Sequence, residues 1–316
     1  AGETSVDFVF PFRTEMLPAL EWAAETSDHW SWSYLYALLL AARDRTGEAA
    51  HILRALGDAP DYAPAYTTRA LLAGAHSQDR ERDLRRAIEL DPGDRLLRIP
   101  FVRQLQREGR WEMALAASRT ALDAFAEDFD LALLHAESLN QLGRFEESIR
   151  IMDDIEVLPS EHSSAAHQLF SHAHVMAGLA ALEVDEPNEA ARHFETAMTW
   201  PERLGQGRPY EPEERLERFL MGVSLSAAGD ARAADEAWTA VARATPRSAF
   251  RGGDVTRLDL LGALSLEKLG RRSELDHFGN GQEGAMARLL RSVRQGARND
   301  TDVASALADA VAEMDD

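Results

Sequence analysis

The sequence contains no cysteine. Disulfide bonds, thiolate nucleophiles and zinc sites built from thiolates are therefore excluded. This composition is compatible with a reducing compartment, and we expect a cytoplasmic protein. Long hydrophobic runs are missing too, because the longest, Ala37 to Ala42, is far too short to cross a bilayer. The chain begins at Ala1 without a signal-peptide pattern, which indicates a processed chain or a fragment of a longer one.

Basic residues are scarce relative to acidic ones. Lys and Arg number 34 against 54 Asp and Glu, so the formal net charge is -20. Such a surface repels phosphate groups, which argues against nucleic acids and anionic membranes as partners. It suits a basic partner, or it serves only to keep the chain soluble through self-repulsion. Hydrophobic residues make up 45% of the 316, so the chain can bury a sizeable core.

A repeat organises the chain. Gly109-Arg110-Trp111 and Gly143-Arg144-Phe145 stand 34 positions apart, and Gly229 opens a third copy. A small residue follows each glycine at the same offset: Ala114, Ser148 and Ala234. A fixed period in the 30s with small residues at fixed places is typical of a helical solenoid. We therefore predict an all-α fold, a right-handed α-α solenoid of about seven helix pairs.

The hydrophobic spacing predicts a lead helix over 14–25, which Thr14 would cap, and seven helix pairs after it. The pairs are expected at 31–43 with 47–57, 64–75 with 79–90, 96–107 with 111–125, 129–141 with 145–156, 161–183 with 187–198, 212–227 with 231–244, and 255–268 with 272–277. Two closing helices at 283–294 and 301–314 would cover the open end of the stack. The domain division is therefore a lead segment over 1–29, a solenoid over 30–277 and capping helices over 278–316.

Three local sequence patterns bear on where the expected helices begin. Trp30 to Tyr36 alternates like a strand, but it runs into an apolar stretch without a turn signal, so we expect the start of a helix. Pro100 falls inside an expected helix, which either begins late, with Pro100 in its first turn, or is kinked there. Pro212 suits the first turn of its helix, where Glu213 and Glu214 would complement the helix dipole.

The helix pairs resemble the tetratricopeptide repeat (TPR). Arg86 to Asp94 is similar to the end of such a repeat. Small and large residues match the family pattern in the fifth and sixth pairs: Gly178, Ala190, Phe194 and Ala197, then Gly222, Leu225, Ala234, Trp238 and Pro246. The pattern has a physical reason, since small residues let two helices approach and large ones fill the gaps between pairs. Ser148 and Arg80 depart from it, because each stands where the family has a small apolar residue.

A second resemblance covers nearly the whole chain. The segments Phe8 to Arg13, Leu158 to His162 and Trp200 to Tyr210 look like the C-terminal repeat region of large bacterial proteins. Those proteins carry an uncharacterised, galactose-mutarotase-like domain on the N-terminal side. The resemblance implies that the chain is part of a longer protein, and it points to carbohydrate metabolism.

The connection over 200–211 is the best candidate for a binding site. It is longer than the other connections, and long loops in compact domains are often functional. It contains Trp200, Arg203, Arg208 and Tyr210, and aromatic rings beside guanidinium groups suit a sugar, a carboxylate or a peptide. The alternative is a rigid loop whose Trp and Tyr fill the gap between the fifth and sixth pairs.

The inner groove is a second candidate, because the TPR resemblance implies that the first helix of each pair lines a concave face. The residues at the lining positions are Arg69, then Leu96, Ile99, Arg103 and Gln106, then Asp130, Leu133, Glu137 and Asn140, then His172, Val175 and Leu179. Arg69 and Arg103 could grip a carboxylate by bidentate hydrogen bonds. The alternative pairs these arginines with acidic residues across neighbouring repeats. The Lys and Asn clamp that some TPR domains use for peptide C-termini is not matched, since Ala65 and Ile99 occupy two of its positions.

Metal and catalytic sites are not expected. His167 and His174 share one face of a long helix and His172 lies on another, so they do not converge as metal ligands do. The glycines from Gly279 to Gly284 follow no strand and lack the Lys-Ser/Thr of a phosphate loop, so we interpret them as a flexible link. Adjacent carboxylates such as Glu213 and Glu214 are explained by helix starts.

The sequence thus favours a non-catalytic scaffold without a cofactor. It would bind a protein or peptide, or a neighbouring domain of a longer chain, through its concave face and the 200–211 loop. Two alternatives stay open. In the first, the chain contributes Arg203, Arg208 and Tyr210 to a carbohydrate site shared with an N-terminal domain. In the second, it is a purely structural arm.

Overall fold

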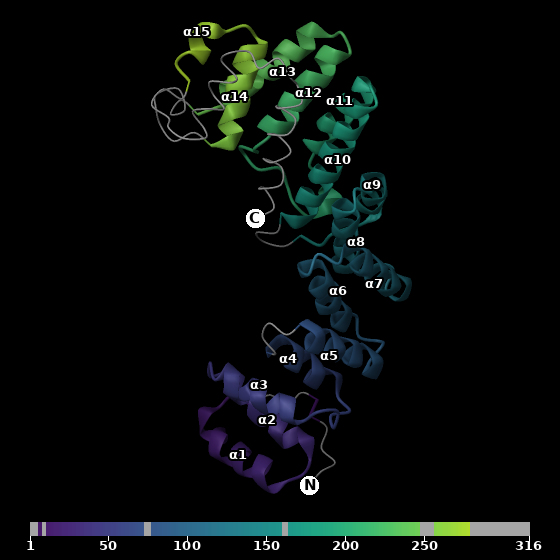
Figure 1. The fold of residues 1–316 in the computed structure, drawn as a ribbon, viewed down its shortest axis with the longest axis vertical. Coiled ribbons are helices and arrows are strands. Elements are labelled where there is room, and N and C mark those ends of the chain that lie inside the picture. Colours follow the sequence, from purple (N-terminus) through teal and green to yellow (C-terminus); the bar gives the residue numbers. More distant parts are fainter. Residues whose placement is uncertain (1–5, 8–10, 73–76, 160–163, 247–255, 279–316) are drawn as a thin grey trace. The chain divides into compact units, whose positions relative to one another are not determined.

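All regular structure in the described part of the chain is helical (Figure 1). The computed structural model describes residues 6–7, 11–72, 77–159, 164–246 and 256–278. Its α-helices are α1 (Leu17–Thr26), α2 (Trp30–Ala41), α3 (Thr46–Ala55), α4 (Ala63–Leu72), α5 (Ser77–Leu90), α6 (Arg98–Arg107), α7 (Trp111–Ala124), α8 (Phe129–Gln141), α9 (Phe145–Asp154), α10 (Ala165–Glu183), α11 (Pro187–Ala197), α12 (Arg215–Ala227), α13 (Ala231–Ala244), α14 (Arg257–Lys268) and α15 (Arg272–Leu275). Three short 3-10 helices accompany them, at Thr14–Met16, Arg95–Leu97 and Glu202–Leu204.

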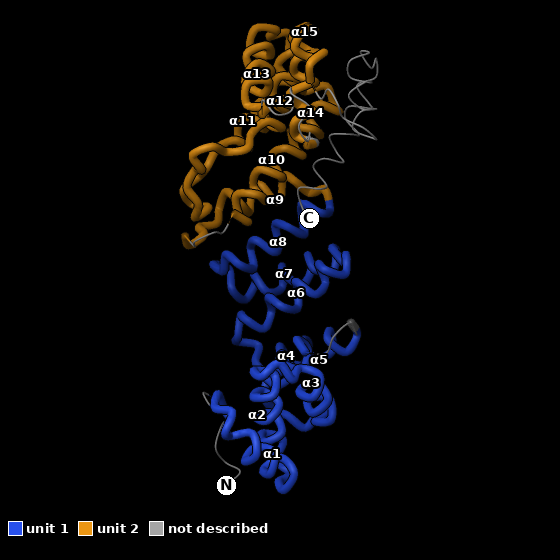
Figure 2. Tube along the Cα trace, turned by 90° about the vertical axis from the view of Figure 1, so that its left-hand side faces the viewer, with its two compact units in different colours: residues 1–142 blue, residues 143–316 orange. Residues whose placement is uncertain are grey.

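The helices form two compact units, residues 1–142 and 143–316, which Figure 2 colours blue and orange. In the first unit α1 packs on α2, and the pairs α2–α3, α4–α5 and α6–α7 follow, then α8 packs on α7. In the second unit α9 packs on α10, and the pairs α10–α11, α12–α13 and α14–α15 follow. The all-α solenoid of successive helix pairs is therefore confirmed. Six of the expected seven pairs lie within one unit, and the expected fourth pair, α8 with α9, is divided because the boundary between the units falls in the turn between them.

Two segments whose sequence also carries a signal against a helix, at Trp30 and at Pro100, are helical as the hydrophobic spacing predicted. The alternating stretch from Trp30 to Tyr36 forms about the first two turns of α2, and its aromatic side chains pack into the apolar cluster of the first unit. Pro100 lies in the first turn of α6, since Arg95–Leu97 forms a separate 3-10 turn and α6 begins only at Arg98. A proline is tolerated there because a first-turn amide has no partner within the helix.

Two predicted helix starts are wrong. Thr14 does not cap the lead helix, because it opens a 3-10 turn, and α1 begins at Leu17 with a proline in its first turn. Pro212 lies before α12, which begins at Arg215. The side chain of Glu213 accepts hydrogen bonds from the backbone and guanidinium N–H groups of Arg215, and this local ring holds the preceding residues in the loop. The predicted closing helices, 283–294 and 301–314, and the glycines at 279–284 lie outside the described residues, so the domain boundaries stay predictions.

The repeated glycines occupy a left-handed backbone position at the end of the first helix of each pair. The φ angles of Gly109, Gly143 and Gly229 are 67°, 71° and 88°. The next amide reaches back to close the helix end, as when the Arg110 N–H bonds the Leu105 carbonyl at 2.9 Å. Asp185 stands at the matching place in the fifth pair, and its φ is 61°. The turn is thus kept where the glycine is absent.

We expect Asp185→Gly to stabilise the second unit by about 0.5–1 kcal/mol. A residue with a Cβ is strained at positive φ, whereas glycine adopts this region freely. The free energy of urea-induced unfolding checks the effect. Gly143→Asp, the matched reverse change at φ 71°, should destabilise the same unit by a similar amount. If neither change altered the unfolding free energy, the turn would not hold its residue in the left-handed conformation.

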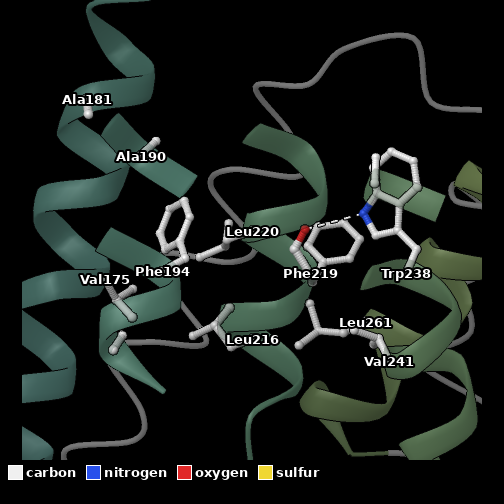
Figure 3. Close-up of a cluster of buried hydrophobic side chains, with 12 residues drawn as sticks. Val175, Ala181, Ala190, Phe194, Leu216, Phe219, Leu220, Trp238, Val241 and Leu261 are labelled. Atoms are coloured by element: carbon white, nitrogen blue, oxygen red, sulfur yellow. Dashed lines mark hydrogen bonds between the residues drawn. The ribbon is translucent and has the colours of Figure 1, made fainter. Parts of the chain in front are cut away.

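In the second unit, small residues of one helix pack against large residues of the other helix of the pair, as the TPR resemblance implies. A Cβ added at Gly178 would lie 2.7 Å from the Phe194 ring, and one at Gly222 would lie 2.5 Å from Nε1 of Trp238. In Figure 3 the Trp238 indole also donates a hydrogen bond to the Phe219 carbonyl, at 3.3 Å. The helices of each pair therefore approach so closely that only glycine fits at these contacts.

Arg80, which departs from the small-residue pattern, shows how the first unit accommodates the exception. Its Nε donates to the Ala70 carbonyl at 2.9 Å, and its Nη1 donates to Oε1 of Gln104 at 3.0 Å. The guanidinium thus binds polar groups of α4 and α6 where other pairs bury a methyl group. Ser148, the other departure, is completely buried in α9.

Candidate binding cavity beside the 200–211 loop

The connection between α11 and α12 is fixed to two other helices of the second unit, α10 and α9. The indole of Trp200 stacks on the imidazole of His167 in α10, with ring centroids 3.4 Å apart and planes 6° from parallel. The His167 ring also donates from Nε2 to the Thr199 carbonyl, at 3.0 Å. This stack and hydrogen bond hold the start of the loop on α10.

A second anchor ties the loop to the end of α9. Nε of Arg203 donates to the Met152 carbonyl at 3.1 Å, and its Nη2 bonds Asp153 at 2.5 Å. The Arg203 carbonyl accepts from the Val157 amide at 2.7 Å. Gly205 follows with a φ of 72°, and a Cβ there would lie 2.8 Å from the Val157 carbonyl oxygen. Arg203 therefore acts as a structural support of the loop.

A cavity of about 340 Å³ lies between this loop and the first helices of the fifth and sixth pairs. Its walls come from α10, the end of α11, the loop and the start of α12, all within the second unit. The wall residues with polar or aromatic groups include His167, Ser171, His172, Trp200, Gln206 and Glu217. Two wall atoms, Nε1 of Trp200 and Oε1 of Gln206, are buried without a hydrogen-bond partner in the described structure.

Glu217 is the most perturbed acidic group of the cavity. Its side chain is 8% exposed, and its Oε1 accepts a long hydrogen bond, 3.4 Å, from the Ser171 hydroxyl. Burial raises the pKa of Glu217 to about 7, and the nearby carboxylates of Glu214 and Glu213 add to the rise. A glutamate in this environment changes its charge close to neutral pH.

The two neighbouring glutamates are compensated by arginines. Glu213 bonds Arg215 at 2.5 Å, and Arg215 also reaches Asp259 of α14 at 2.6 Å. Burial opposes the ionisation of Glu213, but the hydrogen bonds from Arg215 outweigh it and lower the pKa of this carboxyl. Glu214 bonds both Arg208 and Arg218 at 2.7 Å.

The histidines of α10 are distributed as their spacing predicted. His167 and His174 are buried, and burial lowers the pKa of both, that of His174 to about 4. His174 shares a hydrogen bond with His193 of α11, with the two Nδ1 atoms 3.0 Å apart. His172 lies apart from them, against the Phe145 ring. No cluster of three or more His, Asp or Glu side chains able to hold a metal ion occurs among the described residues.

The structure places the other loop candidates in different surroundings. Trp200 and His172 line the cavity, whereas Arg203 is turned toward α9. Arg208 binds Glu214, a residue of the cavity wall. Tyr210 is 97% exposed and fills no gap, so the packing alternative describes Trp200 but not Tyr210.

The groove candidates of the first unit do not form a comparable site. Arg69 is 5% exposed, and its Nε and Nη2 bond the two oxygens of Asp83 at 2.7 Å each. Its Nη1 donates to the carbonyls of Leu53 and Gly57 in the preceding pair. Arg69 is therefore ion-paired, but with an acidic residue of its own helix pair and not across neighbouring repeats as the alternative had it. Arg103 is exposed on α6, while on α8 Glu137 is half-buried and Asn140 is buried.

Sequence reasoning missed Glu217, Ser171 and Gln206. A signal for Glu217 was present: it lies three and seven positions before Leu220 and Ser224, both buried, and so shares their face of α12. A carboxylate inside a buried stripe is unusual unless it is paired. Ser171 and Gln206 carry no comparable signal, because polar residues of these types are common on helix surfaces and in loops.

Comparisons with solved structures agree with this architecture. The chain is similar to the complex of Naa15/Naa10 bound to HypK-THB, with a TM-score of 0.51 and 16% sequence identity, over 88% of this chain and 41% of that chain. It spans only about two fifths of that protein's length. At this identity the likeness bears on the fold alone. The fold is a TPR-like α-solenoid.

Two further solved structures are similar to the TPR-like solenoid at lower scores. A tetratricopeptide repeat protein from Parabacteroides merdae is 13% identical, with a TM-score of 0.46, over 86% of this chain and 100% of that chain. The pilF protein of Pseudomonas aeruginosa is 19% identical, with a TM-score of 0.40, over 67% of this chain and 86% of that chain.

No protein-family model and no curated protein matches the chain. The resemblance to the repeat region beside a mutarotase-like domain therefore has no support from the comparisons and stays a prediction. Within the described ranges of the TPR-like solenoid, every helix is too short or too polar to span a bilayer.

Proposed function

We propose that this chain is a non-catalytic scaffold of the cytoplasm that binds a protein partner, or a neighbouring domain of a longer chain. The binding surface would be the inner helices of its pairs together with the 200–211 loop. A TPR-like solenoid supports such a role because its stacked pairs present an extended surface made of many side chains.

The observation that carries the proposal is the position of Tyr210. Its ring is almost fully exposed, in a loop that is otherwise anchored at Trp200 and Arg203, and its neighbours Pro209 and Glu211 line the cavity. A rigid loop gains nothing in its own stability from an exposed aromatic ring. Tyrosine at the edge of a pocket is a frequent anchor in protein interfaces.

Other exposed side chains also support the proposal. Leu158, which precedes α10, is 67% exposed, and the loop passes against its backbone at Gly205. In the first unit, Leu96 is exposed at the start of the α6 region and Arg103 is exposed on α6. Both were assigned from the sequence to the inner face, and both are accessible to a partner.

We expect Tyr210→Ala to weaken partner binding about tenfold or more, as for an interface anchor. A photo-crosslinking amino acid at position 210 would first capture the partner, and calorimetry with the purified partner would then measure the affinity. Arg232 of α13, whose side chain is 88% exposed, provides the matched control position for crosslinking and for the alanine variant. Equal affinity of the wild type and Tyr210→Ala for that partner would refute the proposal.

A carbohydrate site is a second candidate, favoured by one observation: an aromatic ring, Trp200, lines a cavity that also holds hydroxyl and amide groups. This arrangement suits a sugar ring. A glycan array followed by calorimetry tests it, with loss of binding expected in Arg208→Ala, because Arg208 positions Glu214 in the wall. The scaffold proposal expects no glycan to bind.

A further inference from the structure

We propose that the cavity between α10, α12 and the 200–211 loop is a binding site for a protonated alkylamine, whose ammonium group the Glu217 carboxylate receives. The amine belongs to a lysine side chain of a partner or to a free small molecule. The inference goes beyond the scaffold function, because the cavity could bind an ammonium group of a free small molecule as well as one of a protein partner.

The charge of the wall selects a cation. Four glutamates line the cavity, Glu211, Glu213, Glu214 and Glu217, whereas no arginine or lysine of the described chain does. The arginines that bond Glu213 and Glu214 compensate those two, which leaves Glu217 without a positive partner among its recorded contacts. The net charge of -20 attracts cations toward the molecule as a whole.

Glu217 is built to receive a donor. A carboxylate can accept about four hydrogen bonds, and that of Glu217 accepts one from its own backbone N–H and a long one, at 3.4 Å, from the Ser171 hydroxyl. Only 8% of the Glu217 side chain is exposed, so water satisfies little of the remaining capacity. A buried carboxylate costs free energy unless it is paired, and an ammonium group with three N–H donors would pair it.

The other walls fit the rest of an alkylamine. Oε1 of Gln206 is a buried acceptor without a partner and offers a second site for an ammonium N–H. Val175, Leu216 and Met198 provide apolar surface for the methylene chain. The indole of Trp200 is held in place by His167, and an indole ring attracts a cation through its electron-rich face. A volume of about 340 Å³ is at the small end of ligand pockets, which suits one side chain or a small molecule.

The test uses the whole chain and two probes, n-butylammonium and the peptide acetyl-Ala-Lys-Ala-amide. Binding is followed through the indole N–H signal of Trp200 in the NMR spectrum, assigned with Trp200→Phe, and by calorimetry. We expect the same peptide with norleucine in place of lysine to bind at least tenfold more weakly. Glu217→Gln should also weaken lysine-peptide binding at least tenfold, as expected when a hydrogen bond between charged groups is lost. Glu236→Gln, an equal charge change at an exposed pair on α13, should leave it unchanged.

The pH dependence provides an independent readout. Binding needs the ionised carboxylate, so the affinity should rise about tenfold from pH 6 to pH 8, as the ionised fraction of Glu217 rises. The other titratable groups of the wall are Glu211, Glu213, Glu214, His167 and His172, with Arg215 and Arg218 beside them. The slope should persist in His172→Asn and disappear in Glu217→Gln.

The outcomes distinguish a partner's lysine from a free amine as the ligand, and they test the cation site separately from the scaffold proposal. Tighter binding of the peptide than of n-butylammonium assigns the site to a partner's lysine, and the reverse order assigns it to a free amine. Equal binding of the lysine and norleucine peptides, or unchanged binding in Glu217→Gln, overturns the cation site. The scaffold proposal is judged separately, since it depends on Tyr210→Ala and a protein partner.

Discussion

Replacing Arg69 by alanine is expected to destabilise the first unit by about 3–5 kcal/mol, the usual cost of removing one partner from a buried ion pair. The change would leave the Asp83 carboxylate, which is 2% exposed, without the two hydrogen bonds that satisfy it. It would also leave the carbonyls of Leu53 and Gly57 without their guanidinium donor. Urea unfolding, or hydrogen exchange of α4 and α5 amides, measures the loss.

Two matched variants give the prediction its control. Arg103→Ala, an exposed arginine of the same unit, should change the unfolding free energy by no more than about 0.5 kcal/mol. The double variant Arg69→Met with Asp83→Leu removes both charges together, and it should recover most of the stability. A stable Arg69→Ala protein with weakened ligand binding would instead return Arg69 to the role of a ligand contact.

The Arg69 pair shows where sequence reasoning succeeds and where it stops. The position of Arg69 on the first helix of its pair followed from helical spacing, because period and turn residues are local signals. Whether its side chain points into a groove or folds back onto Asp83 depends on contacts between α4, α5 and the preceding pair. Those contacts are not local, and a pattern of residue types does not contain them.

The same distinction explains the helix ends and the cavity. The left-handed turn is present at Asp185, the position that matches the repeated glycines, although the residue is not glycine. The late start of α12 was missed, because the hydrogen bonds of Glu213 to Arg215 compete with the proline signal at Pro212. The long connection drew attention to a region where the structure has a cavity. The depth of Glu217 in the cavity, however, results from the packing of α10 against the loop.

The charge of Glu217 should limit the stability of the second unit at alkaline pH. Burial raises the pKa of Glu217 from the usual 4.5 to about 7 in the folded protein. The folded state therefore holds the proton more tightly than the unfolded state does. The resulting stability is fully present below pH 4.5 and is lost as the pH rises through 7.

Glu217→Gln removes this penalty, because the amide stays neutral, keeps the shape of the side chain and can still accept from Ser171. We expect the variant to be more stable than the wild type by about 3 kcal/mol at pH 8.5 and by less than about 1 kcal/mol at pH 5. Urea unfolding at the two pH values measures the difference. His174, whose lowered pKa removes stability as the pH falls from 6.5 toward 4, titrates in both proteins and cancels in the comparison.

Glu213→Gln is the matched control for this prediction, since it changes a carboxyl of the same cavity. Arg215 lowers the pKa of Glu213, so this carboxylate contributes stability above its unfolded pKa, and its loss should destabilise the protein at pH 8.5. The two neighbouring variants should thus have opposite signs at one pH. If Glu217→Gln left the unfolding free energy unchanged at pH 8.5, the Glu217 carboxyl would be solvated in the free protein. A cation would then gain little by pairing with it.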